Sequence, residues 1–192
     1  MKRYQVGIDE VGRGPLAGPV SVGIVVVEQG FDFEVLGRFT DSKKMTEKAR
    51  EGVYELARHA RARGDIRFGV YSEPASLIDA KGIVHALNSC IAQGLEDLAC
   101  SAEDVSIFLD GSLRAPRGFQ ATSLVRGDSL IPAISLASVV AKVERDRYMV
   151  DIAHATYPQY GFMSHKGYGT KAHQSAIKVH GLTPIHRRTF IY

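Results

Sequence analysis

The sequence predicts an α/β protein in which a mixed five-stranded sheet is flanked by helices, with a small helical lobe at the C-terminal end. Short apolar runs rich in β-branched residues alternate along the chain with longer segments of helical periodicity. A length of 192 residues and a hydrophobic content of 45% suit one globular domain. After the last long helical segment the chain becomes rich in glycine and proline, which favours a separate small lobe.

The N-terminal part of the chain predicts strands. Residues 4–9 and 20–27 have the β-branched composition of strands, and we expect a third strand over residues 33–39. Their connections are short and contain glycine and proline, which favours antiparallel pairing of the three.

The middle of the chain alternates helix and strand. Residues 47–63 predict a helix because Val53, Leu56, Ala57 and Ala60 share one face. A strand is expected over 66–71, broken at 72–74, and a second helix over 83–98. Further strands are expected over 105–110 and 119–124.

A long helix should begin at Pro132, since proline is tolerated at the first helical position, and should run to about residue 157. Its Arg145, Asp146 and Arg147 are typical of a solvated or ion-paired helix face. A last helix is expected near 171–179. We therefore divide the chain into residues 1–157 and a lobe of residues 158–192 that packs on them.

Composition indicates a cytoplasmic protein. The longest strongly apolar run, residues 22–27, is far shorter than the ~20 residues of a membrane-spanning helix. No signal peptide is visible before the first acids. Cys90 and Cys100 are the two cysteines, and nothing in their placement demands a disulfide, so a reduced compartment is expected.

Charge is distributed unevenly along the chain. All 21 acidic residues precede residue 152, whereas the last 41 residues hold lysine, arginine and most of the histidines, interleaved with aromatic residues. Lysine and arginine neutralise phosphates and aromatic rings stack on bases or sugars, so a polyanionic partner fits this segment. A solvated basic tail with structural aromatics is the alternative. The histidines lack the cysteine partners and short spacing of a zinc site, and we expect none of them to bind metal.

Acidic residues end several of the predicted strands. Asp9 and Glu10 close the first, Asp110 closes the strand over 105–110, and Asp128 precedes the helix that begins at Pro132. Sites in α/β sheets form beyond the carboxyl ends of the strands, and converging carboxylates can hold divalent cations. The competing interpretation is that single acids of this kind form turns or cap helices. Because neighbours on a strand point to opposite faces, Asp9 and Glu10 can share a site only if the strand frays or bulges there.

A glycine-rich turn follows the first two acids. Gly12 and Gly14 flank Arg13, and glycine allows the main chain to approach a ligand without a Cβ in the way. Carboxylates, close main-chain approach and arginine together favour phosphate chemistry.

These residues resemble a known family. The run Asp9-Glu10-Val11-Gly12-Arg13-Gly14-Pro15-Leu16-Ala17-Gly18-Pro19-Val20 resembles the signature of the ribonuclease HII family, the type 2 ribonucleases H. Six further blocks follow in the family's order across nearly the whole chain. They are Asp41-Ser42-Lys43-Lys44, Leu109-Asp110-Gly111, Gly127-Asp128, residues 137–147, residues 165–170, and His186-Arg187-Arg188.

The resemblance implies a ribonuclease H-like fold and a set of functional residues. Asp9, Glu10, Asp110 and Asp128 match the family's catalytic, metal-binding acids, which implies Mg²⁺ or Mn²⁺ as cofactor, with two ions when substrate is bound. The main chain of Gly12, Arg13 and Gly14 would approach the ribose 2′-hydroxyl, the group that distinguishes RNA from DNA. Tyr168 would pack on the following deoxyribose, and Lys43, Lys44 and Lys142 would contact phosphates.

The implied activity is a metal-dependent endoribonuclease. It would degrade the RNA strand of RNA–DNA hybrids and incise on the 5′ side of ribonucleotides embedded in duplex DNA, serving ribonucleotide excision repair and RNA primer removal. Residues 1–157 would be the catalytic domain and 158–192 would complete the substrate cleft. We expect a monomer and no membrane partner, and see no clear sliding-clamp-binding tail after Arg188. The alternatives are another nuclease of this fold that cuts all-DNA substrates, such as a junction resolvase, or a non-catalytic nucleic-acid-binding module.

Overall fold

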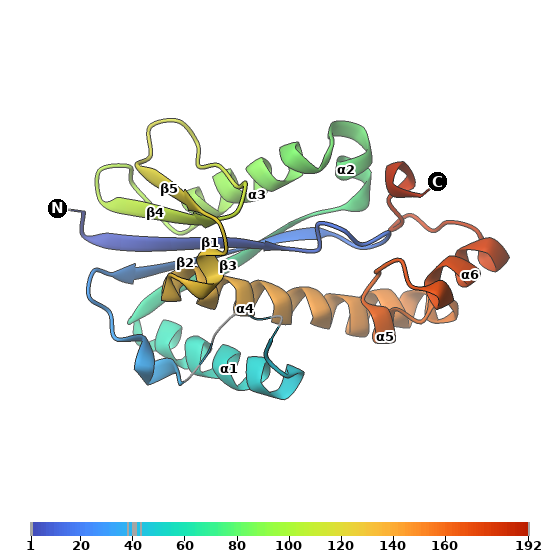
Figure 1. Cartoon of the computed structure of the whole chain (residues 1–192), viewed down its shortest axis with the longest axis horizontal. Coiled ribbons are helices and arrows are strands. Elements are labelled where there is room, and N and C mark those ends of the chain that lie inside the picture. The colour runs from blue at the N-terminus through green and yellow to red at the C-terminus, as the bar shows by residue number, and fades with distance from the viewer. Residues whose placement is uncertain (1, 38, 40–41, 43, 192) are drawn as a thin grey trace.

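A computed structural model of the chain describes residues 2–37, 39, 42 and 44–191. A five-stranded mixed sheet with the strand order β3-β2-β1-β4-β5 forms its centre (Figure 1). The strands are β1 (Tyr4–Val11), β2 (Val20–Glu28), β3 (Ile66–Glu73), β4 (Val105–Asp110) and β5 (Ala121–Leu124). Neighbours β1, β2 and β3 pair antiparallel, while β4 pairs parallel with both β1 and β5. The predicted mixed sheet is confirmed.

Helices cover both faces of the sheet. Helices α1 (Glu47–Arg63) and α4 (Pro132–Arg147) lie on one face, and α2 (Ala75–Lys81) and α3 (Ile83–Asp97) lie on the other (Figure 1). Strand β2 shows why the sheet is central: Ile24 and Val26 belong to the core under α3, whereas Val25 and Val27 belong to the core under α1 and α4. A continuous apolar run suits a strand that is buried on both faces.

Helix α4 lies unusually close to the sheet. A Cβ added at Gly7 of β1 would lie 2.1 Å from the carbonyl carbon of Ala133, and one at Gly23 of β2 would lie 2.2 Å from the carbonyl oxygen of Ala137. Glycine at these two positions therefore lets the helix backbone rest directly on the strands. This close packing fixes α4 against the end of β1, where the first two acids lie.

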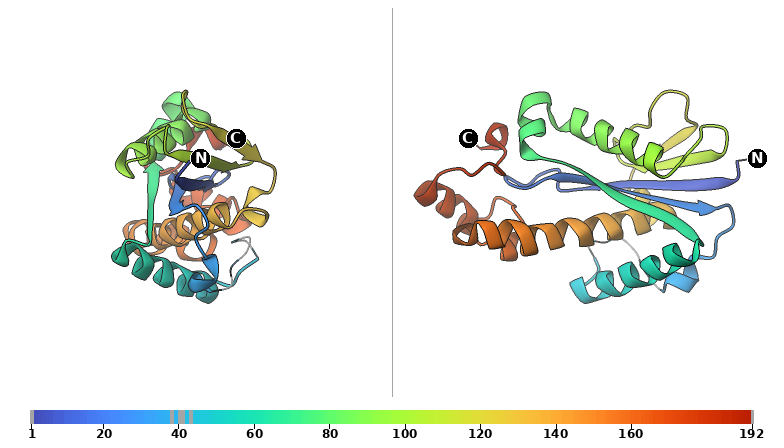
Figure 2. Two further views of the ribbon diagram at one scale, coloured as in Figure 1. Left: turned by 90° about the vertical axis from the view of Figure 1, so that its left-hand side faces the viewer. Right: turned by 180° about the vertical axis from the view of Figure 1, so that it is seen from behind.

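The small C-terminal lobe extends from the far end of α4. The long helix continues beyond α4 as the π-helical turns Tyr148–His154, and α5 (Phe162–His165) and α6 (Lys171–His180) follow (Figure 2). One hydrophobic cluster joins Tyr160 and Phe162 of the lobe to Met149 of the long helix and to Ala17, which lies between β1 and β2. The lobe thus contacts the segment that follows the first acids.

Two sequence expectations are wrong. The strand expected over 33–39 is a 3₁₀ helix over Phe33–Leu36, which Asp32 caps by accepting a hydrogen bond from the Glu34 amide at 2.9 Å. The third antiparallel strand is β3 instead. Helix α2 was missed because Pro74 suggested only a break, whereas Pro74 is the N-cap of that helix. No helix within the described ranges is long and apolar enough to cross a membrane.

Candidate active site

Three of the four predicted acids come together at one edge of the sheet. Parallel pairing of β1 with β4 ends at Ile8 and Leu109, so Asp9 and Asp110 are the next residue of each strand just beyond that pairing. One carboxylate oxygen each from Asp9, Glu10 and Asp110 lies within 4.8 Å of the others. We call these three residues the acid cluster.

The cluster forms without a bulge in β1. Pairing with β2 continues unbroken through Val11, but pairing with β4 stops one residue before Asp9. The Asp9 carboxylate turns along the chain and accepts a hydrogen bond from the Glu10 amide at 2.7 Å. The expectation that Asp9 and Glu10 could share a site only if the strand frayed or bulged is therefore wrong, because β1 stays paired with β2 past both residues.

The electrostatics of the cluster favour a bound cation. Burial raises the pKa of Asp9, and the nearby carboxylates of Glu10 and Asp110 act in the same direction. A hydrogen bond from the Ser138 hydroxyl opposes them, and together these effects raise the pKa to about 7. The buried Oε2 atom of Glu10 has no hydrogen-bond partner among the described residues. A buried Asp9 carboxylate beside two half-buried ones that repel it, with an unpartnered oxygen on Glu10, fits a hard divalent cation, which seeks oxygen ligands.

Asp128 lies next to the cluster without being one of its three members. It is buried in a short 3₁₀ turn, Gly127–Ser129, before α4. The Gly127 amide donates a hydrogen bond to Oδ1 of Asp110 at 2.6 Å, which ties this turn to the end of β4. Asp128 does not cap α4, whose N-cap residue is Ile131.

The glycine-rich turn, residues 12–19, begins beside the acids. The Arg13 guanidinium donates to Oε1 of Glu10 at 3.2 Å and to the Ser112 hydroxyl at 3.1 Å. Gly12 has a φ of +81°, and a Cβ there would lie 2.1 Å from Nε of Arg145. A Cβ at Gly14 would meet nothing within 4 Å. Packing therefore requires glycine at position 12 but leaves the space beside position 14 open.

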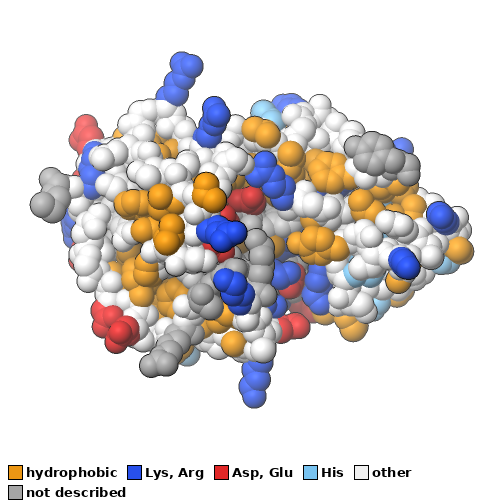
Figure 3. All heavy atoms as spheres, viewed as in Figure 1, with side chains coloured by type: hydrophobic (Ala, Val, Ile, Leu, Met, Phe, Trp, Pro, Cys, Tyr) orange, Lys and Arg blue, Asp and Glu red, His pale blue; other side chains and the backbone are white. Residues whose placement is uncertain are grey.

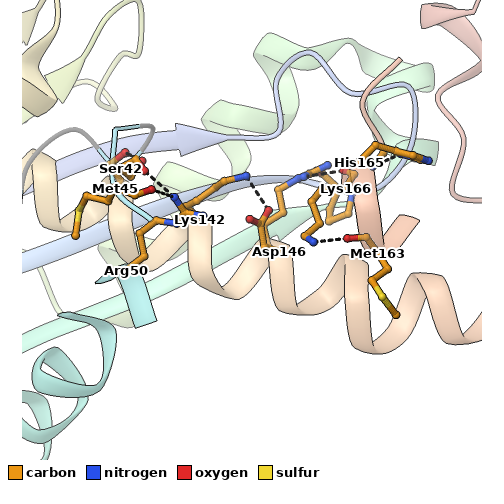
Figure 4. Close-up of polar contacts among 12 residues, drawn as sticks. Ser42, Met45, Arg50, Lys142, Asp146, Met163, His165 and Lys166 are labelled. Carbon is orange, nitrogen blue, oxygen red and sulfur yellow. Dashed lines mark hydrogen bonds and ion pairs between the residues drawn. The ribbon is translucent and has the colours of Figure 1, made fainter. Parts of the chain in front are cut away.

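The predicted lysines have different surroundings. Lys142 on α4 forms an ion pair with Asp146, with its Nζ 2.8 Å from Oδ1 (Figure 4). Lys44 is exposed, and Lys43 lies outside the described residues. Ser42, two residues before Lys44, lies close to the acid cluster, because its hydroxyl is 2.7 Å from that of Ser138, which hydrogen-bonds to Asp9. On the face of the molecule seen in Figure 3, Lys and Arg side chains lie beside acidic ones near the centre.

Tyr168 lies between α5 and α6 with 41% of its surface exposed. Its amide donates to the His165 carbonyl at 2.9 Å, and its carbonyl accepts from Nδ1 of His173 at 3.0 Å. The Leu16 amide donates to the carbonyl of Gly167 at 2.8 Å. The structure therefore places the segment that carries Tyr168 directly against the glycine-rich turn.

Sequence reasoning missed two buried arginines at this site. Arg145 was expected on a solvated face, but it is 1% exposed, and Arg187 is fully buried. The expectation holds for Arg147, which pairs with Glu51 on α1. The spacing contained a signal for Arg145, since it falls four residues after the buried Ala141 and four before the buried Met149 on one helix face.

Comparison with known proteins gives a consistent result. A family model described as Ribonuclease HII matches residues 6–192. The ribonuclease HII of Bacillus mycoides is 42% identical over 188 residues, which cover 97% of this chain and 68% of that protein. The ribonuclease HII of Archaeoglobus fulgidus, solved in a complex with PCNA, has a TM-score of 0.77 at 23% identity and covers 98% of this chain and 96% of its own. A ribonuclease HIII (Bst-RNase HIII) solved in complex with Mn²⁺ has a TM-score of 0.69 at 18% identity, covering 97% and 66%.

Proposed function

The chain belongs to the ribonuclease HII family, and we propose on that premise that it cuts the RNA strand of RNA–DNA hybrids and incises on the 5′ side of ribonucleotides embedded in duplex DNA. The observation that carries the proposal is the acid cluster, in which three carboxylates from two adjacent strands meet within 4.8 Å. The products would be a 3′-hydroxyl and a 5′-phosphate.

The donor set suits a divalent cation, and we propose Mg²⁺ or Mn²⁺, with two ions in the substrate complex. Asp9, Glu10 and Asp110 would hold the ions together with Asp128, whose turn is tied to Asp110 through the Gly127 amide. Such ions activate a water for in-line attack on phosphorus and stabilise the leaving oxygen. The protein's own contribution is to hold the carboxylates ionised and in place. Ser138 supports this by its hydrogen bond to Asp9.

We assign substrate selection to the glycine-rich turn and Tyr168. The main chain of Gly12, Arg13 and Gly14 would contact the ribose 2′-hydroxyl, and the exposed Tyr168 ring would pack on the next sugar. The hydrogen bond from the Leu16 amide to the Gly167 carbonyl joins the glycine-rich turn to the segment that carries Tyr168, so that the two would form one continuous binding surface.

The surrounding parts of the chain would hold the duplex. We propose that Lys43, Lys44 and Lys142 contact phosphates, Lys142 by exchanging Asp146 for a phosphate oxygen. Residues 1–157 would act as the catalytic domain and residues 158–192 would complete the cleft. Since one chain supplies the acid cluster, the turn and Tyr168, a monomer suffices for activity. The PCNA complex is a property of the Archaeoglobus protein, and no observation on this chain adds a clamp to the proposal.

The proposal is tested with a labelled RNA–DNA hybrid and an all-DNA duplex of the same sequence. We expect cleavage of the hybrid's RNA strand with Mg²⁺ or Mn²⁺, none with a chelator, and an intact all-DNA control. Cleavage of the all-DNA duplex would favour a different nuclease of this fold. Salt-dependent binding of both duplexes without any metal-dependent product would favour a binding module.

A further inference from the structure

Two buried arginines face the inner side of the glycine-rich turn. Arg145 comes from α4 and Arg187 from the C-terminal segment, and each side chain is at most 1% exposed. Among the described residues, neither guanidinium has a carboxylate oxygen within the 4.0 Å of an ion pair. We call these two residues the arginine pair.

The arginine pair binds main-chain carbonyls instead of acids. Arg187 donates to the carbonyls of Gly12 at 2.6 Å, Arg13 at 3.1 Å and Gly18 at 3.0 Å. Arg145 donates to three others, those of Ala17 at 3.3 Å, Pro19 at 2.9 Å and Lys166 at 3.2 Å. Five of these six carbonyls belong to the glycine-rich turn, so the pair holds the turn at both of its ends.

This arrangement costs free energy. Burial, together with the positive charge of Arg145, lowers the pKa of Arg187 to about 9. Two buried cations close to each other, without a carboxylate in ion-pair contact, are stabilised mainly by the carbonyl dipoles to which they donate hydrogen bonds. An apolar residue could fill the same space without that cost but could not bind the carbonyls. We therefore infer that the arginines are there to orient the main chain of the turn.

The orientation of the carbonyls sets the orientation of the amides. In a trans peptide the C=O and the N–H point in opposite directions, and no described peptide is cis. The Gly12 and Arg13 carbonyls point inward to Arg187, so the amides of Arg13 and Gly14 point away from it. Neither amide donates a hydrogen bond within the part of the chain that the structure describes. The amides that follow are already paired: those of Leu16 and Ala17 donate to the Gly167 carbonyl, and that of Gly18 donates to the Ile185 carbonyl.

We propose that Arg187 is a positioning residue for substrate selection. By fixing the two peptide planes between Gly12 and Gly14, it presents the Arg13 and Gly14 amides as paired donors to the 2′-oxygen of the ribonucleotide. The inference rests on the proposed function, and it makes the preference for ribose depend on a side chain that does not itself contact the substrate.

The arginine is itself held in place by its neighbours. The amides of Arg188 and Thr189 donate to the Asp79 carboxylate of α2 at 2.9 and 3.0 Å. The Arg187 guanidinium also lies over the Phe190 ring at 5.2 Å. Asp79 therefore offers a milder way to disturb Arg187 without altering the turn.

The test measures affinity for a duplex with one ribonucleotide relative to the matched all-DNA duplex, in an Asp110→Asn background that binds without cutting. We expect Arg187→Lys to lower this ratio by about tenfold, the loss of one hydrogen bond at about 1.4 kcal/mol. Arg147→Gln, which alters an arginine that pairs with α1, should leave the ratio unchanged. If Arg187→Lys weakens both duplexes equally and the ratio persists, Arg187 only stabilises the fold and the proposal is wrong.

A second variant covers the case in which Arg187→Lys does not fold. Asp79→Ala should lower the same ratio by a smaller factor, and an unchanged ratio in a folded Asp79→Ala protein would also overturn the proposal. Failure of the proposed function would be seen separately, as an absence of hybrid cleavage by the unsubstituted enzyme. If the affinity ratio falls in the variants while the unsubstituted enzyme still cleaves the hybrid, the effect is due to the positioning role of Arg187.

Discussion

The amide of Gly127 donates a hydrogen bond to Oδ1 of Asp110 at 2.6 Å, and this contact joins the end of β4 to the turn before α4. It explains how two acids 18 positions apart in sequence come to lie next to each other. A Cβ at Gly127 would lie 2.7 Å from Cδ1 of the buried Ile134, so a larger residue there would have to displace that side chain. The fourth acid is thus positioned by a main-chain contact to the third.

Asp110→Asn should abolish cleavage with little effect on duplex binding. Asparagine keeps an oxygen for the Gly127 amide but removes the negative charge that a divalent cation requires. We expect the rate of cleavage to fall by at least about a hundredfold, since loss of even an outer partner of a metal site costs ~10–100-fold. The measurement is single-turnover cleavage beside an affinity measurement. Asp104→Asn, at an exposed acid that pairs with Ser101, is the control, and strong residual turnover in Asp110→Asn would remove Asp110 from the site.

Tyr168→Ala should impair cleavage at an isolated ribonucleotide more than cleavage of a long hybrid. The exposed ring supplies a packing surface for the sugar at the junction, while a long hybrid offers many alternative registers. Comparing kcat/KM on the two substrates checks this, with Leu182→Ala as a control at another exposed apolar residue of the lobe. Equal losses on both substrates would argue against a junction-sensing role.

Divalent cations should stabilise the folded protein through the acid cluster. At pH 8 the Asp9 carboxyl, whose pKa is raised to about 7 by burial and by its acidic neighbours, is ionised and repelled. A bound cation relieves this repulsion, so Mn²⁺ should raise Tm over a chelator control, and more at pH 8 than at pH 5.5, where protons compete for the carboxylates. Asp9→Asn should lose most of the Mn²⁺-induced rise. A rise that survives in Asp9→Asn would place the cation elsewhere.

Stability should fall between pH 6.5 and pH 4 because of a buried histidine pair. Nε2 of His173 and Nε2 of His186 are 3.1 Å apart, and burial together with the neighbouring ring lowers the pKa of His186 to about 4. On acidification the unfolded chain takes up a proton on this histidine near pH 6.5, whereas the folded chain does so only near pH 4. The contribution of His186 to the free energy of unfolding is therefore complete above pH 6.5 and falls on acidification, by at most about 3 kcal/mol.

The pH dependence is measured by denaturant unfolding at several pH values. Between pH 6.5 and 4, His186→Gln should flatten the slope of the free energy of unfolding against pH. His59→Gln, at an exposed histidine on α1, should leave that slope unchanged. A slope that His186→Gln does not alter would assign the effect to other groups. Because the pair also anchors the carbonyl of Tyr168 through His173, loss of activity should accompany the loss of stability.

Residues whose roles depend on local pattern could be predicted from the sequence. The placement of Asp110 at the end of its strand and the helix over residues 47–63 follow from spacing, and both are confirmed, whereas β1 continues two residues beyond Asp9. Roles that depend on tertiary contacts could not. Arg187 shows no periodic signal, and its contact with Gly12 spans 175 positions. The expected strand over 33–39 failed because the Asp32 cap, a local side-chain hydrogen bond, favoured a 3₁₀ turn over an extended chain.

The most direct test of the account is cleavage of an end-labelled DNA duplex that contains one ribonucleotide, beside an all-DNA duplex, with Mg²⁺, Mn²⁺ or a chelator. The account predicts one metal-dependent cut on the 5′ side of the ribonucleotide and an intact all-DNA duplex. An uncut ribonucleotide, or equal cutting of both duplexes, would contradict it.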